Sequence, residues 1–463
     1  MRAFIDGFKL IRIESDIYIH TIELNNNQVN WLKNENFNQF FATEKPICLH
    51  QDDHIVVNDV RIPLEIGVVT LSKEFEQQFR YDGALGVDYR QDRSTFRLFT
   101  PVAKEVDVVI DQISYPMVYE MPIWMTTVFG DLEGKAYHFS VRLVDTFDVV
   151  NDPYAIGAGL HKNHIIDWNK TIPIHPSSVK LKHPVDAVLY EGHVRDLTIH
   201  LDVESKGLFD GLIEKSKLLK TSVIGYVKKL GITHLQLLPV YDFEGVDDVF
   251  KTHSYNWGYN PSQFFCVEGW FSKDPDNPYD RIDGFKKVIN EAHRLGLGIN
   301  MDVVFNHVYQ YWTFPYDHLV PGYFYRHNAR HKMTDASYCG NDIETRNYMV
   351  RKLIIDNLKH WVTHYQVDGF RFDLMGLLDL ETMQQIETAL KKIHPSIMLY
   401  GEGWNMPSEV PARLRSNMAN QAAFPKISHF NDSFRHVMKG ELHGPGLGYA
   451  MGNHALVQKA MQV

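Results

Sequence analysis

Residues 346–374, RNYMVRKLIIDNLKHWVTHYQVDGFRFDL, join a helix pattern to a short strand pattern and decide the fold class. Apolar residues recur at helical spacing over residues 346–365, and Gly369–Leu374 is a short apolar run that also carries charged residues. The same alternation continues from Asp186 onward, and alternating strands and helices are typical of parallel βα units. The stretch therefore predicts an α/β region in the second half of the chain.

Five further apolar runs complete a set of six predicted strands. They lie at residues 187–194, 234–240, 297–307, 397–403 and 426–432. Six βα units in a row, with polar residues at the strand ends, favour a (β/α)8 barrel of the TIM type over an open sheet. A barrel needs eight strands, and the chain ends at Val463 soon after the sixth. We therefore expect an incomplete, C-terminally truncated barrel domain at residues 183–463.

The first part of the chain shows β patterns. Residues 1–80 contain short apolar runs between polar turns, which predicts an N-terminal β-rich domain. Alternating residues in 85–110 and a further run at 136–145 predict a β-sandwich domain at 84–170. Residues 167–184 are rich in Pro, Ser and Lys, which is typical of a linker. The whole chain is thus expected to be a multidomain protein.

The composition limits the partners and the location. A formal net charge of -10 argues against a nucleic-acid or anionic-membrane partner. No apolar stretch is long enough to span a bilayer, and the charged first sixteen residues show no signal peptide. The three cysteines, Cys48, Cys266 and Cys339, are far apart, which favours reduced thiols in a cytoplasmic protein. No Cys or His pair has zinc-ligand spacing, and nothing indicates an obligate protein partner.

Polar residues gather at the ends of three predicted strands. Asp302 and His307 follow the third strand, Arg371 and Asp373 the fourth, and Glu402 the fifth. In a barrel of parallel strands, active-site residues lie at the C-terminal strand ends. These five residues are therefore candidates for one site.

Two of the carboxyl groups have surroundings that suit different chemical roles. Arg371 and Asp373 are two residues apart on a strand, so both side chains project to one side, and a neighbouring guanidinium favours an ionised Asp373. An ionised, positioned carboxylate suits a nucleophile. Glu402 lies between glycines and near Trp404, and a partly apolar setting raises the pKa of a carboxyl group and suits a general acid. Roughly 5 Å between the two carboxyl groups would support a retaining glycosidase mechanism.

Residues 253–265, HSYNWGYNPSQFF, are too aromatic for an ordinary solvated loop and too interrupted for a helix or a strand. The stretch follows the second predicted strand. Flat, rigid rings offer a large contact area to the apolar face of a sugar. We interpret Tyr259 as a stacking platform and Tyr255 and Trp257 as walls of a sugar-binding surface.

Each feature also has a purely structural interpretation. An Arg-Asp pair can be an ion pair, a Glu between glycines can be a turn residue, and an aromatic stretch can be a hydrophobic cluster under a loop. Their occurrence together, in order, at successive strand ends favours a catalytic site.

The same motifs resemble those of a known family. DVVFNH, GFRFDLMGLLD and GEGW are similar to signature regions of the alpha-amylase superfamily of glycoside hydrolases. YNWGYNP resembles the signature of type I pullulanases, usually written with Asp where this chain has Asn260. Residues 84–170 resemble the starch-binding-type β-sandwich that precedes such barrels. The resemblance covers about residues 84–450, and the first eighty residues lie outside it.

The resemblance implies a debranching hydrolase that cleaves α-1,6-glucosidic bonds in pullulan, glycogen or starch-derived dextrins. It implies Asp373 as nucleophile and Glu402 as acid/base. The residues that would bind the α-glucan are Tyr255, Trp257, Tyr259, Asp302, His307, Arg371 and Trp404. No cofactor is implied as required, and calcium is left open. The family's third acidic residue has no match after Glu402, so we expect it beyond Val463 and expect the chain's own hydrolytic activity to be impaired.

Other functions remain open at this point. An isoamylase, a branching enzyme or an α-1,4-specific amylase belongs to the same superfamily, although YNWGYNP argues against the amylase. A non-catalytic glucan-binding protein is favoured by the missing carboxylate and disfavoured by the presence of both Asp373 and Glu402. Hydrolysis of pullulan compared with amylose separates these alternatives.

Overall fold

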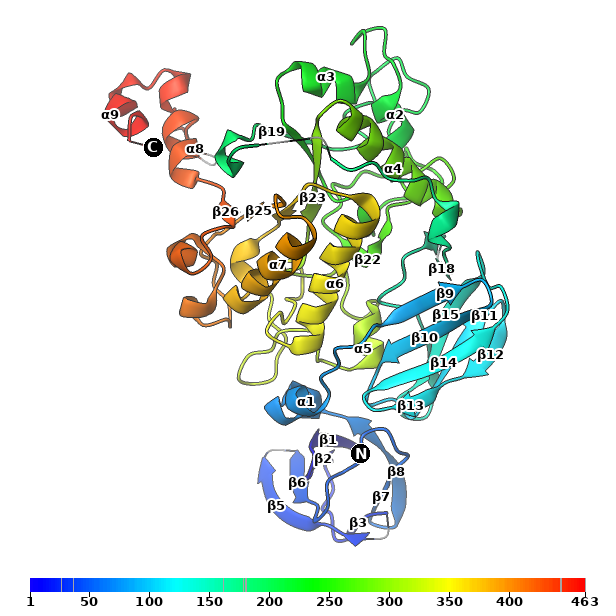
Figure 1. The fold of residues 1–463 in the computed structure, drawn as a ribbon. Helices are drawn as coiled ribbons and strands as arrows, with labels where there is room; N and C mark the ends of the chain where they lie inside the picture. Colours follow the sequence, from blue (N-terminus) through cyan, green and yellow to red (C-terminus); the bar gives the residue numbers. More distant parts are fainter. Residues whose placement is uncertain are drawn as a thin grey trace.

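The structure, a computed structural model, describes residues 1–25, 27–35, 37–160, 162–177, 179, 181–441 and 444–462. Figure 1 shows three groups of elements that follow one another along the chain. Two β-rich groups form one end of the molecule, and the helices and parallel strands of the third group form the other. The multidomain organisation expected from the sequence is confirmed at this level.

The first group is an eight-stranded sheet with the order β4-β3-β7-β8-β1-β2-β6-β5. Its strands are β1 (Arg2–Gly7), β2 (Leu10–Glu14), β3 (Ile22–Leu24), β4 (Asn27–Gln28), β5 (Asn30–Glu35), β6 (Asn38–Ala42), β7 (His54–Val57) and β8 (Val60–Ile66). Alternate residues such as Ile11, Ile13 and Phe41 are buried, as a sheet with one covered face requires. Helix α1 (Lys73–Gln78) follows and begins after the capping residue Ser72.

The second group consists of two sheets, ordered β13-β14-β10-β9 and β12-β11-β15-β18-β17, with β16 also paired to β15. Its strands are β9 (Gly86–Arg90), β10 (Arg93–Phe99), β11 (Glu105–Ile110), β12 (Ile113–Pro116), β13 (Val118–Glu120), β14 (Ile123–Phe129), β15 (Ala136–Arg142), β16 (Phe147–Val150), β17 (Ala158–Gly159) and β18 (Lys162–His164). Phe96 of one sheet contacts Tyr137 of the other, with ring centroids 5.5 Å apart. The strands predicted within residues 85–110 and 136–145 are therefore confirmed.

The third group contains six parallel strands in sequence order. They are β19 (Leu189–Gly192), β20 (His234–Leu237), β23 (Gly298–Val303), β24 (Gly369–Phe372), β25 (Met398–Gly401) and β26 (Ser428–His429). All residues of β20, β23 and β24 are buried, which is typical of a parallel sheet covered on both faces. All six predicted strands are present, and within the described part of the sheet β19 and β26 are its edges.

Helices and a hairpin connect these strands. The helices are α2 (Phe209–Ile213), α3 (Val223–Lys229), α4 (Pro278–Arg294), α5 (Pro315–Leu319), α6 (Tyr348–Tyr365) and α7 (Leu380–Ile393), and the hairpin is β21 (Tyr241–Phe243) with β22 (Pro261–Val267). The helix predicted at 346–365 is thus confirmed, and α6 buries Leu353, Leu358 and Trp361. Among the residues described, no helix combines the length and the apolar character needed to cross a bilayer.

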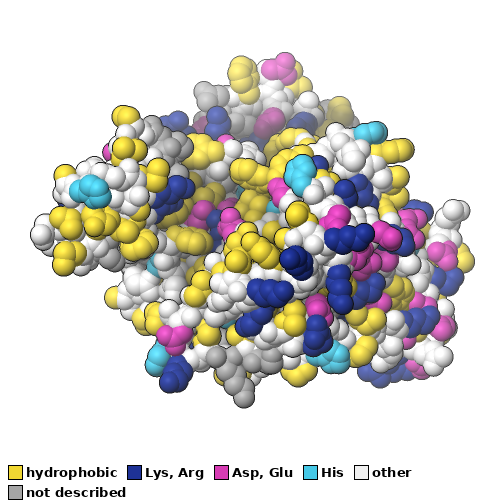
Figure 2. Space-filling view, turned by 90° about the horizontal axis from the view of Figure 1, so that it is seen from above, with side chains coloured by type: hydrophobic (Ala, Val, Ile, Leu, Met, Phe, Trp, Pro, Cys, Tyr) yellow, Lys and Arg dark blue, Asp and Glu magenta, His cyan; other side chains and the backbone are white. Residues whose placement is uncertain are grey.

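The C-terminal helices α8 (Asp432–Met438) and α9 (Val457–Ala460) lie in a small lobe beside the sheet (Figure 1). Seen from above, the surface is hollowed between this lobe and the main body, and acidic and basic side chains lie in the hollow (Figure 2). The lobe exposes Phe434, Leu447, Met451 and Met461.

The first group is joined to the third through Glu76 of α1. Its carboxylate accepts a hydrogen bond from the backbone N–H of Tyr348, the first residue of α6 (2.7 Å), and another from the Tyr323 hydroxyl (2.5 Å). Asn347 makes no side-chain cap at this helix end. An acid at a helix N-terminus satisfies a free N–H and interacts favourably with the helix dipole. Glu76 therefore helps to position α6, which leads into β24.

The segment predicted as a linker, residues 167–184, is in contact with the helices of the third group. The Lys286 ammonium donates to the Thr171 hydroxyl (2.7 Å), and the Trp168 ring stacks on His364 of α6 with centroids 4.1 Å apart. Burial, together with the nearby Lys286 charge, lowers the pKa of His364 to about 4.

This stacked histidine predicts a pH-dependent stability. The unfolded chain binds a proton at His364 below about pH 6.5, whereas the folded chain does so only near pH 4, so folding loses stability as the pH falls through this window. Between pH 6.5 and 4 we expect the melting temperature of His364→Gln to fall less than that of the wild type. The difference should be about 2–4 °C for each ~1 kcal/mol that protonation of His364 costs the folded chain, and the cited pKa bounds that cost at roughly 3 kcal/mol. Differential scanning calorimetry measures both falls in melting temperature, and equal falls would contradict the assignment.

Candidate active site

The charged residues predicted at three strand ends meet around the Arg371 guanidinium. Its three ion-pair contacts are with carboxylate oxygens on β23 and after β24 and β25: Asp302 Oδ1 at 3.0 Å from Nη1, Asp373 Oδ1 at 2.9 Å from Nη1 and Glu402 Oε1 at 2.7 Å from Nη2. The sequence predicted the Arg371–Asp373 pair. The contacts to Asp302 and Glu402 connect three neighbouring strands and were not predicted.

Strand register explains why these side chains converge. Asp302 pairs with Arg371 across β23 and β24, and Arg371 pairs with Tyr400 across β24 and β25. Successive residues of a strand point to opposite faces, so Arg371 and Asp373 project to the same side, and Glu402 does so with Tyr400. The positions at the C-terminal ends of three adjacent strands thus bring three carboxylates to one cation.

Burial shapes the protonation of Asp302 and Arg371. Burial raises the pKa of Asp302 to about 8, although Arg371 and the hydrogen bond from Tyr259 oppose this rise. Burial disfavours the charged guanidinium, but Asp302, Glu402 and Asp373 together raise the pKa of Arg371 above its usual value. Arg371 therefore stays charged, and its positive charge stabilises the negative charge of the surrounding carboxyl groups.

Glu402 has the raised pKa that its sequence context predicted. Burial is the largest cause, the Asp373 charge adds to it, and Arg371 opposes it. The backbone N–H of Leu374 donates to Glu402 Oε2 (3.1 Å), and the Trp404 indole is a further donor that lowers the pKa. A carboxyl group with a raised pKa beside an Arg-paired carboxylate suits general acid chemistry.

Asn306 was missed by the sequence reasoning. Its amide nitrogen donates to Asp373 Oδ2 (2.8 Å) and to the Asp373 carbonyl oxygen (3.0 Å). Its amide oxygen lies 2.6 Å from Nδ1 of His307, whose Nε2 lies 3.0 Å from the Tyr259 carbonyl oxygen. Burial lowers the pKa of His307. The only signal for Asn306 in the sequence was its place within DVVFNH, from which Asp302 and His307 were chosen as candidates.

The aromatic stretch is part loop and part strand. Residues 261–267 form β22, so the prediction that residues 253–265 are too interrupted for a strand is wrong for the second part. Pro261 begins this strand of a two-stranded sheet, a position that needs no further N–H donor. The first part bends at Gly258, whose φ of +100° favours glycine, and a Cβ there would lie 3.0 Å from Pro239 and Phe243.

Tyr259 lies directly beside the carboxylates. Its hydroxyl donates to Asp302 Oδ2 (2.8 Å), and its ring lies 5.9 Å from the Arg371 guanidinium carbon. Burial and the Asp302 charge raise the pKa of the Tyr259 hydroxyl, so it stays protonated. The ring and the hydroxyl of Tyr259 therefore belong to the same site as the three carboxylates.

Tyr255 and Trp257 lie at the exposed rim, with 48% and 58% of their surface accessible. The Tyr255 hydroxyl donates to Asp196 (2.5 Å), the Trp257 indole donates to the Tyr255 oxygen (3.0 Å), and the Arg195 guanidinium carbon lies 5.2 Å from the Tyr255 ring centroid. Arg195 and Asp196 follow β19 and were not predicted as supports. Tyr255 and Trp257 are held as a pair, separately from the Arg371 cluster.

Two substitutions at Tyr259 test its proposed role as a platform. Tyr259→Ala removes the ring, and we expect maltotriose binding to weaken by roughly 1–2 kcal/mol, the scale of an aromatic contact. Tyr259→Phe keeps the ring and removes one donor to Asp302, so we expect a smaller loss. Isothermal titration calorimetry measures both losses, and equal losses would assign the effect to the hydroxyl.

The site contains no group of metal ligands. Within the described ranges, no three His, Cys, Asp or Glu side chains are placed to hold a metal ion together. The chemistry available here is that of three differently buried carboxyl groups, one fixed cation, an amide donor and an aromatic face.

The chain was compared with known proteins. No protein-family model matches it. It is 36% identical to the pullulanase of Bacillus subtilis (strain 168) over 427 residues, which cover 86% of the chain and 57% of that relative. It is similar in structure to the pullulanase of Anoxybacillus sp. LM18-11 complexed with maltotetraose, at a TM-score of 0.94 and 32% identity, covering 100% of the chain and 70% of that structure.

A second similar structure is the type I pullulanase of Bacillus subtilis str. 168 complexed with maltose. Its TM-score is 0.91 at 33% identity, and the match covers 100% of the chain and 68% of that structure. The chain thus spans 57% of the length of the Bacillus subtilis (strain 168) relative and a larger share of the two solved structures.

Proposed function

The chain belongs to the type I pullulanases of glycoside hydrolase family 13, and we propose that it serves to hydrolyse α-1,6-glucosidic bonds in pullulan, glycogen or starch-derived dextrins. The observation that carries the proposal is the contact of one guanidinium, Arg371, with Asp302, Asp373 and Glu402. Similar structures that hold maltotetraose or maltose support an α-glucan as the ligand.

The proposed reaction is a double displacement with retention of configuration. The Asp373 carboxylate attacks the anomeric carbon while Glu402 donates a proton to the departing glycosidic oxygen, which leaves as an alcohol. The ionised Glu402 then takes a proton from water, whose oxygen displaces Asp373 from the anomeric carbon. Each carboxyl group ends the cycle in the protonation state in which it began.

The neighbouring residues have different roles in positioning the nucleophile and binding the glucan. Asn306 and Arg371 hold Asp373 at a fixed position. Tyr259 offers its ring to the reacting glucose, and Asp302 and His307 hold its hydroxyl groups. Trp404 borders the leaving sugar, and Tyr255 with Trp257 extends the surface for the glucan chain. Contacts of Tyr259, Asp302 and His307 with one another support a single subsite.

We also propose that the six parallel strands are an arc of a (β/α)8 barrel in a domain at residues 183–463. A cavity of about 690 Å³ between the two edge strands supports this arrangement, with Leu189 of β19 and Ser428 of β26 in its lining. Residues 1–80 and 84–170 are proposed as an N-terminal β-rich domain and a starch-binding-type β-sandwich. The cytoplasmic location expected from the first sixteen residues stays a prediction.

The test is to incubate the purified 463-residue chain with pullulan and, separately, with amylose. We expect maltotriose from pullulan at the impaired rate that the sequence predicts, less product from amylose, and an α-anomer as the first product in proton NMR, because two inversions retain the configuration. A β-anomer would refute the double displacement. Hydrolysis of amylose alone would indicate an α-1,4-specific enzyme, and binding without hydrolysis would indicate a non-catalytic glucan-binding protein.

A further inference from the structure

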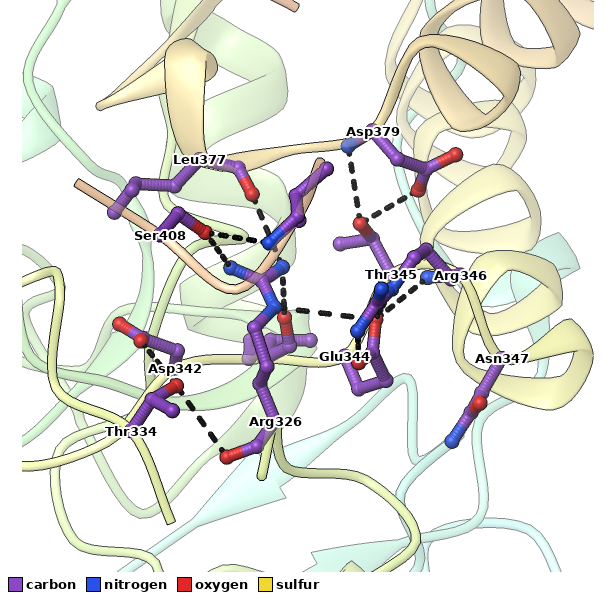
Figure 3. Close-up of polar contacts among 12 residues, drawn as sticks. Arg326, Thr334, Asp342, Glu344, Thr345, Arg346, Asn347, Leu377, Asp379 and Ser408 are labelled. Atoms are coloured by element: carbon purple, nitrogen blue, oxygen red, sulfur yellow. Dashed lines mark hydrogen bonds and ion pairs between the residues drawn. The ribbon is translucent and has the colours of Figure 1, made fainter. Parts of the chain in front are cut away.

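A second buried guanidinium, Arg326, lies among the loops that carry the catalytic candidates. It is 1% exposed, and its hydrogen bonds run to Ser408 Oγ from Nη1 (3.0 Å) and to the carbonyl oxygens of Ile343 (2.8 Å) and Leu377 (3.0 Å) from Nη2. Figure 3 shows Arg326 between Ser408, Leu377 and Glu344. Ile343 lies between α5 and α6 in the connection that follows β23, Leu377 ends a short 3-10 helix in the connection that follows β24, and Ser408 lies in the connection that follows β25. These connections are called the loops after β23, β24 and β25.

The contact with Ile343 leads to Asp373 in two steps. The Ile343 N–H donates to the carbonyl oxygen of Asn306 (2.9 Å), and the Asn306 amide donates to the Asp373 carboxylate (2.8 Å). Ile343 is therefore held by Arg326 at its carbonyl and holds Asn306 through its N–H. A shift of this loop would move the donor that fixes Asp373.

The contact with Leu377 leads to Glu402. The backbone N–H groups of Leu374 and Gly376 donate to Glu402, to its carboxylate (3.1 Å) and its carbonyl oxygen (3.0 Å) respectively. Leu374 has φ 40° and ψ 43°, a left-handed conformation that is strained for a residue with a side chain. Such strain persists only where surrounding contacts hold the backbone in place, and the Arg326–Leu377 bond is one of them.

The contribution of Arg326 to the stability of the fold does not by itself explain a buried guanidinium at this position. Burial lowers its pKa, which means that the fold pays to keep the charge inside, and its carboxylate contact, Glu344, lies 3.9 Å away. Glu344 is also paired with the half-exposed Arg346. Glu344, Asp342 and Asp379 favour the charged form but do not offset the effect of burial, and such a buried cation is weak evidence for stabilisation. Its rigid fork, however, can contact carbonyl and hydroxyl groups of three loops at once.

We propose that Arg326 is a positioning residue for the hydrolytic reaction, which fixes the three loops after β23, β24 and β25 so that Asp373 and Glu402 keep their mutual geometry. The inference rests on the proposed function. Arg326 touches neither carboxylate and acts through Ile343 and Leu377.

The main test is Arg326→Lys, which keeps the positive charge but lacks the two guanidinium nitrogens that contact the three loops. We expect kcat for pullulan to fall by about 10–100-fold with little change in KM, because a misplacement of about 1 Å at a reacting group costs up to roughly 10²-fold. We also expect the pKa of Glu402 to rise, since loss of the Leu374 N–H bond removes a contact that stabilises the charged carboxylate. A role in stability alone would not move that pKa.

The titration of Glu402 is measured without catalysis. Tryptophan fluorescence is recorded against pH. The pH-dependent change in emission that is absent from both Trp404→Phe and Glu402→Gln reports the titration of Glu402, because its carboxyl group lies beside the Trp404 indole. If the wild-type chain hydrolyses no glucan, the proposed function fails, and this titration still decides whether Arg326 positions Glu402. An unchanged midpoint in Arg326→Lys together with an unchanged kcat overturns the inference.

Arg346→Lys is the matched control, because Arg346 pairs with Glu344 in the same network and contacts none of the loop groups held by Arg326. We expect the wild-type midpoint and the wild-type kcat from it, and an equal effect of the two substitutions overturns the inference. If Arg326→Lys does not fold, Ser408→Ala decides: it removes the hydroxyl that accepts from Nη1, and a smaller loss of kcat with unchanged KM is expected. Unchanged kcat in Ser408→Ala then overturns the proposal.

Discussion

Asp373→Asn is expected to lower the rate of pullulan hydrolysis by about 10⁴-fold or more, the scale on which removal of a nucleophile acts in other hydrolases. An amide cannot form the covalent intermediate, so the remaining groups can only bind and polarise the substrate. The substitution keeps the shape of the side chain and one oxygen that accepts from Asn306 or Arg371. Substrate binding should therefore change little.

Two measurements separate loss of chemistry from loss of fold. Maltotriose binding by calorimetry should stay within a few-fold of the wild type, and the melting temperature should remain similar. Asp356→Asn is a matched control on α6, because Asp356 pairs with Lys352 and lies outside the Arg371 cluster. A variant at position 373 that hydrolyses pullulan at the wild-type rate would remove Asp373 from the proposed role.

The parts of the fold that were predicted are those specified by local pattern. The strand Gly369–Phe372 is buried on both faces and follows an 18-residue helix with a buried stripe. Its phenylalanines and the preceding helix pattern predict a covered parallel strand, although the strand also carries Arg371. Arg371 and Asp373 are two residues apart, and their contact follows from strand geometry. The direction of the Glu402 pKa was also predicted, but its cause is not local: burial raises it most, Asp373 on the neighbouring strand end adds to it, and the nearby Trp404 indole lowers it.

The parts that were missed depend on contacts between distant segments. Asn306 reaches Asp373 across 67 positions of sequence, and Asp196 reaches Tyr255 across 59. Neither pair leaves a periodic or compositional signal. The strand that begins at Pro261 was missed for a different reason: a proline signals a turn in a single sequence, and only its pairing with β21 shows that it starts a strand.

Arg371→Gln is expected to affect stability and activity together. Three carboxylates lose their shared cation, and breaking a buried ion pair in this way costs about 3–5 kcal/mol. The pKa values of Asp302 and Glu402, already raised by burial, should rise further because Arg371 lowers both in the wild type. Asp373 also loses one of the donors that hold its carboxylate in place, so we expect hydrolysis at pH 7 to be lost almost completely.

The sign of the pH dependence distinguishes this cause from simple misfolding. A carboxyl group with a raised pKa binds its proton more tightly in the folded chain, so its cost to stability grows as the pH rises from the unfolded value toward the folded one. For Asp302 this window runs from about pH 4 to about pH 8. Removing Arg371 raises the folded-state pKa of Asp302 and so moves the upper limit of this pH range to higher pH. The difference in melting temperature between Arg371→Gln and the wild type should therefore be small near pH 4 and largest at neutral and alkaline pH.

Arg351→Gln supplies the comparison, because Arg351 is also buried and contacts two carboxylates, Asp379 and Glu381, away from the Arg371 cluster. It should lower the melting temperature and leave the pH profile of kcat/KM in place, whereas Arg371→Gln should move both limbs of that profile to higher pH. If both variants keep the wild-type profile, Arg371 is a structural ion-pair partner and does not set the charge of the reacting carboxylates. If only Arg371→Gln shifts it, the contact of one guanidinium with three strand-end carboxylates controls which of them holds a proton when the glycosidic bond breaks.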